Sequence, residues 1–98
     1  MVEASVAIQV LPKVKKDDVF RVVDKVIEYI KATGLNYFVS PFETTIEGDF
    51  DTLCDIVKEC QLICIREGAE SVSSYVKFSL NPNGVWTIGE KVDKYNAE

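Results

Sequence analysis

Residues 40–51 read Ser-Pro-Phe-Glu-Thr-Thr-Ile-Glu-Gly-Asp-Phe-Asp and join a polar strand to the start of a helix. Residues 43–47 alternate between two sets of side chains, which is the period of a β-strand. Asp49 follows as a suitable N-cap for a helix over residues 50–67. The segment also gathers hydroxyls, carboxylates and an aromatic ring, so a small-molecule site is expected here first.

The patterns on both sides of this segment predict the remaining elements. Residues 2–11 and 72–80 alternate apolar with polar side chains, as half-buried strands do. Apolar residues recur at three- and four-residue steps between Val19 and Ile30, which is the spacing of one helix face. In chain order we expect a strand at 2–11, a helix at 17–33, strands at 36–39 and 43–47, a helix at 50–67, a strand at 72–80, a turn at 81–84 and a short helix beginning near Ile88.

The order strand, helix, strand, strand, helix, strand is the split βαβ arrangement. We therefore predict an α+β fold, a ferredoxin-like sandwich (βαββαβ) whose four-stranded antiparallel sheet carries two helices on one face, followed by a short C-terminal helix. Right-handed crossovers put strands 2–11 and 43–47 at the centre of the sheet, with 36–39 at an edge. The 98 residues, 47% of them hydrophobic, fit one domain over 1–98.

Composition argues against several classes of function. The net charge of −5 disfavours a nucleic-acid partner, because phosphate contacts need clustered lysine and arginine. The chain has no histidine, so imidazole-based triads and the usual histidine metal sites are absent, and we expect neither a metal nor a catalytic residue. Its glycines stand singly, which does not support a glycine-rich phosphate loop.

The compartment is expected to be the cytoplasm. The beginning of the sequence lacks a basic segment followed by a continuous apolar run, so no secretion signal is recognised. No apolar stretch approaches the roughly 20 residues that a membrane helix requires. Cys54, Cys60 and Cys64 are odd in number and fall in one expected helix, where disulfide geometry is unfavourable, so we expect reduced thiols in which Cys60 and Cys64 pack as small apolar groups.

Four segments resemble one known family: residues 4–10, 44–48, 49–51 and 87–92. The chain resembles the small thiamine-binding (YkoF-like) proteins over essentially its whole length, and the Thr-Thr-Ile-Glu-Gly run at 44–48 is the most specific part. The resemblance implies a ferredoxin-like fold, assembly into homodimers or homotetramers, and non-catalytic binding of thiamine or its hydroxymethylpyrimidine moiety without any further cofactor.

Thiamine carries a fixed positive charge and a flat aminopyrimidine, so its site needs aromatic faces, a carboxylate and neutral hydrogen-bonding groups. Glu47, at the end of a central strand, is the candidate carboxylate for the pyrimidine, and a solvated strand-end glutamate is the alternative. Lys77 alone is weak support for a phosphate, so the unphosphorylated vitamin or its pyrimidine fragment is expected. The expected ligand-binding residues are Gln9, Tyr37, Ser40, Phe42, Thr44, Thr45 and Glu47.

For several of these residues a structural role is an equal or better explanation. Threonine is a good strand residue, and each aromatic side chain more often packs in a core or an interface. Gln9 is expected near Thr45 on the polar sheet face, where it either reads a ligand or faces a partner subunit. Ala7 and Tyr75 share that open face, which an oligomer is expected to cover.

Two other functions stay open at this level. The first is a structural or regulatory assembly module that uses the open sheet face and binds no small molecule. The second is an acylphosphatase-like hydrolase on the same fold, which needs an arginine in a phosphate-cradling loop. Residues 11–15, after the first strand, contain no arginine, so the hydrolase is the weakest of the three.

Overall fold

A four-stranded antiparallel sheet in the order β2-β3-β1-β4 organises the chain. The computed structural model describes residues 2–96. Its elements are β1 (Val2–Pro12), a 3₁₀ turn (Lys16–Asp18), α1 (Val19–Ala32), β2 (Tyr37–Val39), β3 (Thr44–Gly48), α2 (Phe50–Arg66), β4 (Val72–Val85) and α3 (Ile88–Asn96).

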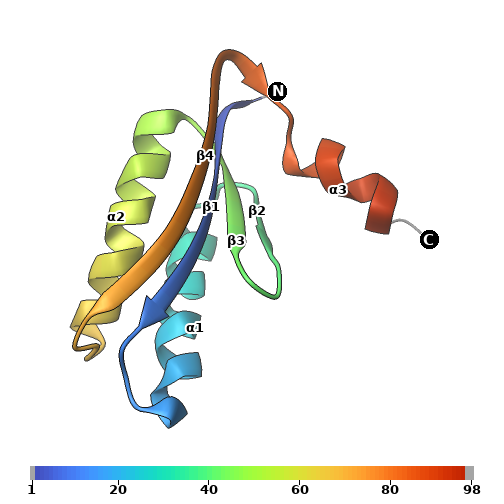
Figure 1. Cartoon of the computed structure of the whole chain (residues 1–98). Helices are drawn as coiled ribbons and strands as arrows, with labels where there is room; N and C mark the ends of the chain where they lie inside the picture. Colours follow the sequence, from blue (N-terminus) through green and yellow to red (C-terminus); the bar gives the residue numbers. More distant parts are fainter. Residues whose placement is uncertain (1, 97–98) are drawn as a thin grey trace.

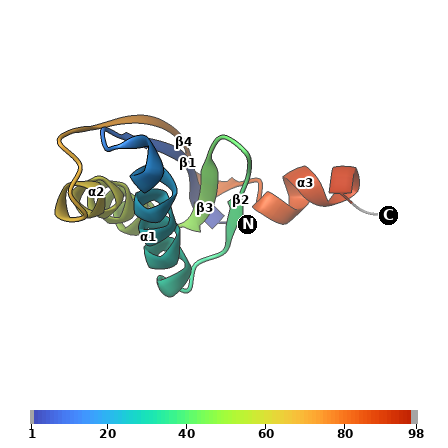
Figure 2. The same cartoon turned by 90° about the horizontal axis from the view of Figure 1, so that it is seen from below.

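Helices α1 and α2 lie side by side on one face of the sheet, whereas α3 extends away from the body beyond β2 and β3 (Figures 1 and 2). The predicted ferredoxin-like βαββαβ order is confirmed, with β1 and β3 at the centre and the short β2 at one edge. Within the described residues, no helix is long and apolar enough to cross a membrane.

The core lies between the sheet and the two packed helices. Alternation along β1 turns Ala4, Val6 and Ile8 inward, and each is at most 4% exposed. Burying a valine or isoleucine side chain stabilises the fold by roughly 1.5–3 kcal/mol, so Val6 and Ile8 contribute much of the stability. The opposing helix residues, each at most 9% exposed, are Val22, Val26 and Ile30 of α1 and Leu53, Ile56, Cys60, Ile63 and Cys64 of α2.

The ends of α2 are set by the residues that the sequence indicates. Asp49 is the N-cap, and its side-chain oxygens accept hydrogen bonds from the Thr52 N–H at 3.1 Å and the Thr52 hydroxyl at 2.7 Å. Gly68 follows the helix with φ of 103°, a left-handed conformation that costs an L-residue energy. These two signals fix where the chain leaves β3 and where it turns toward β4.

The prediction that the fourth strand ends in a turn at 81–84 is wrong. β4 continues to Val85, because Leu80 pairs with Ala4 and Val85 pairs with Val2. The intervening residues form a bulge, in which the Asn83 N–H donates to Asn81 Oδ1 at 3.0 Å. Turn-forming residues therefore bend this strand without ending it, and the extra length carries the chain to the start of α3.

The start of α3 is held by its own cap and by the sheet. Thr87 and Glu90 form a capping box, in which the Glu90 N–H donates to Thr87 Oγ1 at 3.1 Å and the Thr87 N–H donates to Glu90 Oε1 at 2.9 Å. Hydrogen bonding of the Glu90 carboxyl group to the Thr87 backbone N–H and side chain holds the pKa of Glu90 below its ordinary value. Trp86, just before the helix, is 65% exposed.

Candidate functional site

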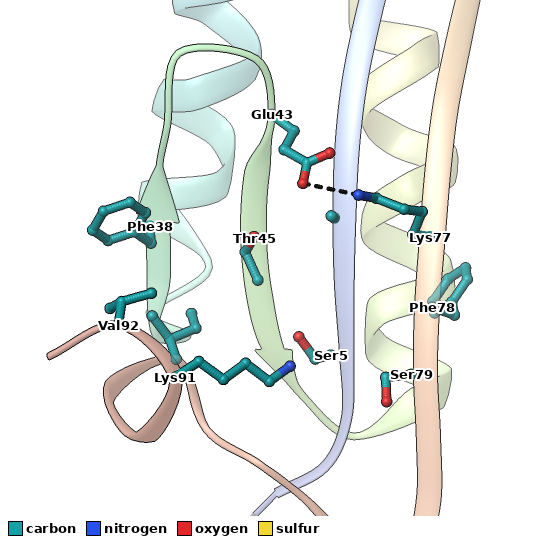
Figure 3. Close-up of a pocket in the computed structure, with 11 residues that line it drawn as sticks. Ser5, Phe38, Glu43, Thr45, Lys77, Phe78, Ser79, Lys91 and Val92 are labelled. Carbon is teal, nitrogen blue, oxygen red and sulfur yellow. Dashed lines mark ion pairs between the residues drawn. The ribbon is translucent and has the colours of Figure 1, made fainter. Parts of the chain in front are cut away.

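A cavity of about 310 Å³ lies between the open face of the sheet and the first turns of α3 (Figure 3). All four strands and α3 contribute to it. The lining residues are Ser5 and Ala7 of β1, Phe38 of β2, Glu43 and Thr45 at the start of β3, Lys77, Phe78 and Ser79 of β4, and Ile88, Lys91 and Val92 of α3.

The floor of the cavity is formed by the central strand. Ala7 pairs with Thr45 on one side and with Lys77 on the other, so the three side chains stand in one row across the sheet. Ser5 forms the next row with Ser79. Side chains in one row point to the same face of the sheet. The small Ala7 side chain therefore leaves a hollow between the larger side chains of Thr45 and Lys77.

Three hydroxyl groups in the cavity form no side-chain hydrogen bond with the described part of the chain. Ser5 is only 6% exposed, and Thr45 and Ser79 stand on the strands beside it. Within residues 2–96, the side-chain hydroxyls that form hydrogen bonds belong to Thr33, Ser40, Thr52 and Thr87. Hydroxyls that are not engaged by the protein and that open into a cavity can donate to or accept from a bound molecule, so these groups are suited to ligand contact.

Charged groups stand at two places in the cavity. Lys77 Nζ lies 3.2 Å from a Glu43 carboxylate oxygen, and Figure 3 shows this pair at one end. The side chain of Lys91 extends from α3 toward Ser5 in the same view. Lys91 forms no ion pair with any of the described residues, so its ammonium group is available to a ligand.

Apolar groups complete the walls. Phe38 presents an aromatic ring from β2, while Ile88 and Val92 approach from α3. The α3 residues are in place because Glu47 Oε2, on the end of β3, accepts a hydrogen bond from the Ile88 N–H at 2.8 Å. The site therefore depends on how α3 is attached to the sheet.

Glu47 has a different position from the one expected of a ligand carboxylate. It is 7% exposed, and its second oxygen accepts a hydrogen bond from Asn36 Nδ2 at 2.7 Å. With both oxygens engaged inside the protein, the carboxylate joins three segments of the chain and does not line the cavity. The alternative of a solvated strand-end residue is also wrong, because Glu47 is a buried structural group.

Of the other expected site residues, only Thr45 lines this cavity. Tyr37 and Thr44 point to the helix-covered face, as does their neighbour Ile46. The Ser40 hydroxyl is used in the β2–β3 turn, where it donates to the Glu43 carbonyl at 2.7 Å. Alternation and local turn chemistry therefore place these side chains away from the hollow.

Gln9 and Phe42 also lie outside the cavity beside α3. Gln9 pairs with Tyr75 and lies two residues beyond Ala7, the partner of Thr45, so it is on the same sheet face as Thr45 and near it, as expected, although it does not line the cavity. Phe42 is 78% exposed at the tip of the β2–β3 turn. Both residues line a second hollow of about 240 Å³ along α1, together with Ser40, Thr44 and mainly aliphatic residues of β1 and α1. In that hollow the Ser40 hydroxyl is used in the turn, and only the Thr44 hydroxyl forms no side-chain hydrogen bond among residues 2–96, whereas the first hollow has three such hydroxyls.

The sequence contains a signal for part of the true lining. Alternation on β1 and β4 already assigns Ser5, Ala7, Lys77 and Ser79 to the face opposite the apolar residues. The contribution of Lys91 carries no local signal, because it depends on where the bulge in β4 directs α3. Of the residues expected from the sequence, Thr45 of β3 therefore lies in this cavity, whereas the wall formed by α3 was not expected.

The three cysteines lie in α2, on the side of the sheet opposite the cavity. All three are free thiols, and Cys60 and Cys64 are fully buried in α2, as predicted. Burial raises the pKa of the Cys60 thiol to about 12 and raises that of Cys64 as well. Among residues 2–96, no group of three or more cysteine, aspartate or glutamate side chains is placed to hold a metal ion.

Comparison with known proteins points to one group. The family model described as thiamine-binding protein matches residues 6–96. A UPF0045 protein of Clostridium perfringens is 52% identical over 91 residues, which cover 93% of this chain and 95% of that protein.

Two solved structures share the fold and much of the sequence. A domain of unknown function, DUF77, from Bacillus cereus superposes with a TM-score of 0.88 at 41% identity, covering 98% of this chain and 92% of that one. A candidate thiamine biosynthesis or salvage protein from Thermotoga maritima superposes with a TM-score of 0.85 at 34% identity, covering 96% and 99%.

Proposed function

The chain belongs to the thiamine-binding protein family, and on that premise we propose that it binds the hydroxymethylpyrimidine moiety of thiamine in the cavity between the open sheet face and α3. The observation that carries the proposal is the set of unpartnered hydroxyls, with the nearly buried Ser5 at its centre. A mainly apolar cavity with a few placed polar groups favours a small heteroaromatic ligand.

The size of the cavity favours the pyrimidine over the whole vitamin. Small-molecule sites usually measure about 300–1,000 Å³, and this one, at about 310 Å³, is at the lower end. A single substituted ring suits that volume better than two linked rings. The thiazolium of thiamine would therefore extend out of the cavity if the intact vitamin binds.

The groups in the cavity match the edges of an aminopyrimidine. Phe38 offers an aromatic face, and Val92 and Ile88 offer apolar contact. The Glu43 carboxylate and the Thr45 hydroxyl are acceptors for an exocyclic amino group. Glu43 thereby takes the role that we had assigned to Glu47 from the sequence.

Binding without chemistry is part of the proposal. The chain has no histidine, and its buried thiols lie in α2, on the far side of the sheet from the cavity. No side chain in the cavity is both a nucleophile and adjacent to a histidine base, which is the usual arrangement for covalent catalysis. The protein would therefore act as a carrier or buffer in the cytoplasm, where free thiols persist.

Isothermal titration calorimetry against hydroxymethylpyrimidine and thiamine tests the proposal. We expect stoichiometric binding, with the fragment contributing most of the affinity. Replacing Ala7 by leucine fills the floor of the cavity and should abolish that heat. The matched control is Gln9→Leu on the same strand, outside the cavity, which should bind as the parent does. Absence of heat in the folded parent protein would contradict the proposal.

A specific observation favours self-association as a second property. Tyr75, Trp86 and Tyr95 are each at least 65% exposed on β4 and α3. Large exposed aromatic side chains are enriched in interfaces, so we include assembly into a homodimer or homotetramer in the proposal. Light scattering after size exclusion measures the mass. A mass that is oligomeric and independent of ligand, in protein that gives no heat, would support the assembly module alone.

A further inference from the structure

We infer that the cavity recognises a phosphate monoester of the pyrimidine alcohol in preference to the neutral alcohol, and that Lys91 is the residue that determines this preference. The inference rests on the proposed function, because it concerns the ligand of the same site. It begins from the side chains that α3 brings to the sheet.

The side chains that line the cavity carry more positive charge than the protein as a whole, and the nearby Glu47 carboxylate, the register partner of Ser5, already accepts hydrogen bonds from Asn36 and Ile88. The lining includes one carboxylate, Glu43, and two ammonium groups, Lys77 and Lys91, whereas the whole chain carries a net charge of −5. The Lys77 ammonium is satisfied by Glu43 at 3.2 Å, which leaves Lys91 as the excess charge. An acidic protein that orients an unpaired lysine over a concave surface creates a local attraction for an anion.

The polar groups near Lys91 are those that a phosphate uses. In Figure 3 the Lys91 side chain extends toward Ser5, and Ser79 is the register partner of Ser5 on β4. Neither hydroxyl has a partner among residues 2–96, and both can donate to a phosphate oxygen. One ammonium and two hydroxyls at the same end of the cavity form a charge-assisted donor set.

The opposite end of the cavity gives the ligand its direction. Glu43 repels a phosphate but accepts hydrogen bonds from an amino group, so it favours the ring of the ligand at its own end. The phosphate then lies toward Lys91, Ser5 and Ser79. A ligand with an amino group at one end and a monoester at the other fits both ends of the cavity, whereas a cationic thiazolium beside Lys91 meets a like charge.

The test compares three probes by calorimetry: hydroxymethylpyrimidine, its phosphate monoester and inorganic phosphate. The parent protein is expected to bind the monoester at least ~10-fold more tightly than the alcohol, with inorganic phosphate the weakest of the three. Raising the salt concentration should reduce this preference, because screening weakens an ammonium–phosphate contact that is open to solvent. The alcohol should bind with the same affinity at low and high salt.

Variants isolate the charge on Lys91. Lys91→Gln should weaken binding of the monoester much more than binding of the alcohol and so remove the preference, and Lys91→Arg should restore the preference. Lys58→Gln, an exposed substitution in α2 on the helix-covered face, is the charge-matched control and should change neither affinity. Lys91 is exposed and glutamine is a good helix former, so α3 should persist, which circular dichroism checks.

The outcomes separate this inference from the proposed function. If the alcohol and the monoester bind equally, or if Lys91→Gln weakens both to the same extent, the phosphate preference is wrong and the pyrimidine site stands. If neither binds to folded protein, both are wrong. Binding of the monoester without detectable binding of the alcohol supports the preference in its strongest form.

Discussion

Glu47 shows how one side chain can connect the parts of a small fold. It is the buried carboxylate of this sheet, and its two oxygens accept from Asn36, before β2, and from Ile88, at the start of α3. Removing one acceptor leaves a buried N–H without a partner, which costs more than the hydrogen bond itself contributed. Its importance is therefore for stability and for the placement of α3.

Substituting Glu47 by glutamine should lower the free energy of unfolding by about 1–3 kcal/mol. The glutamine NH₂ group cannot accept a hydrogen bond, so one of the two donors, Asn36 Nδ2 or the Ile88 N–H, loses its partner. Urea denaturation measures the loss. Glu70→Gln serves as the control, since its ion pair with Lys13 at 3.5 Å joins two largely exposed side chains and contributes about 0–1 kcal/mol. Equal losses in the two variants would contradict the structural role of Glu47.

At the scale of elements, the cap of α2 makes stability depend on pH. Hydrogen bonds from the Thr52 hydroxyl and backbone N–H hold the pKa of Asp49 below its ordinary value. A carboxyl group whose pKa falls on folding stabilises the native state above its unfolded pKa, and this contribution is lost as the pH falls through the folded pKa. The N-cap of α2 therefore contributes more to the free energy of unfolding near neutral pH than in acid.

Asp49→Ala should reduce the urea midpoint at pH 7, because the Thr52 N–H loses its acceptor. The gap between variant and parent should narrow as the pH is lowered below about 4, where the parent carboxyl group also becomes protonated. Denaturation followed by circular dichroism across this range gives the comparison. A gap that stays constant down to the lowest pH would show that the charge of Asp49 contributes nothing.

The elements also show what the sequence can and cannot predict. The strands and both packed helices follow from alternation, from the helical spacing in α1 and from the Asp49 and Gly68 signals, all of which are local. The turn residues at 81–84 were misread because they are compatible with a strand bulge when β1 continues to supply partners. Tertiary pairing decides between a turn and a bulge, and no local pattern records it.

The candidate site was predicted less well than the fold for the same reason. Thr45 was recognised because it lies on the polar face of a strand with clear alternation. Glu47 looks equally polar in sequence, yet its partners come from two distant segments, so its burial emerges only in three dimensions. Lys91 lines the cavity because the chain after β4 brings α3 to the sheet. The direction of that segment depends on the pairing of Val85 with Val2, which are far apart in the sequence.

On the scale of the whole molecule, the sheet and its two helices form one unit and α3 forms an addition to it. The main core cluster draws on β1, α1, β3 and α2, and Ile88 is not part of it. The cavity, in contrast, exists only where α3 meets the sheet. The main core therefore does not require α3, whereas the cavity requires both the sheet and α3.

A chain of residues 1–85 should still unfold cooperatively, because its core is intact, although it will be less stable than the parent since Glu47 loses the Ile88 N–H. The same chain should give no heat with hydroxymethylpyrimidine, because the wall formed by Val92 and Lys91 is gone. Thermal unfolding by circular dichroism and calorimetry with the ligand provide the two measurements. Undiminished binding by residues 1–85 would place the site away from α3.

The position of Trp86 has a practical consequence for all of these experiments. It is the single tryptophan of the chain, 65% exposed, and it occupies the joint between β4 and α3. The emission of an indole ring moves to shorter wavelength as water leaves its surroundings. A ligand that draws α3 against the sheet, or a second chain that covers this joint, changes those surroundings. The fluorescence of Trp86 therefore reports on changes at the joint between β4 and α3.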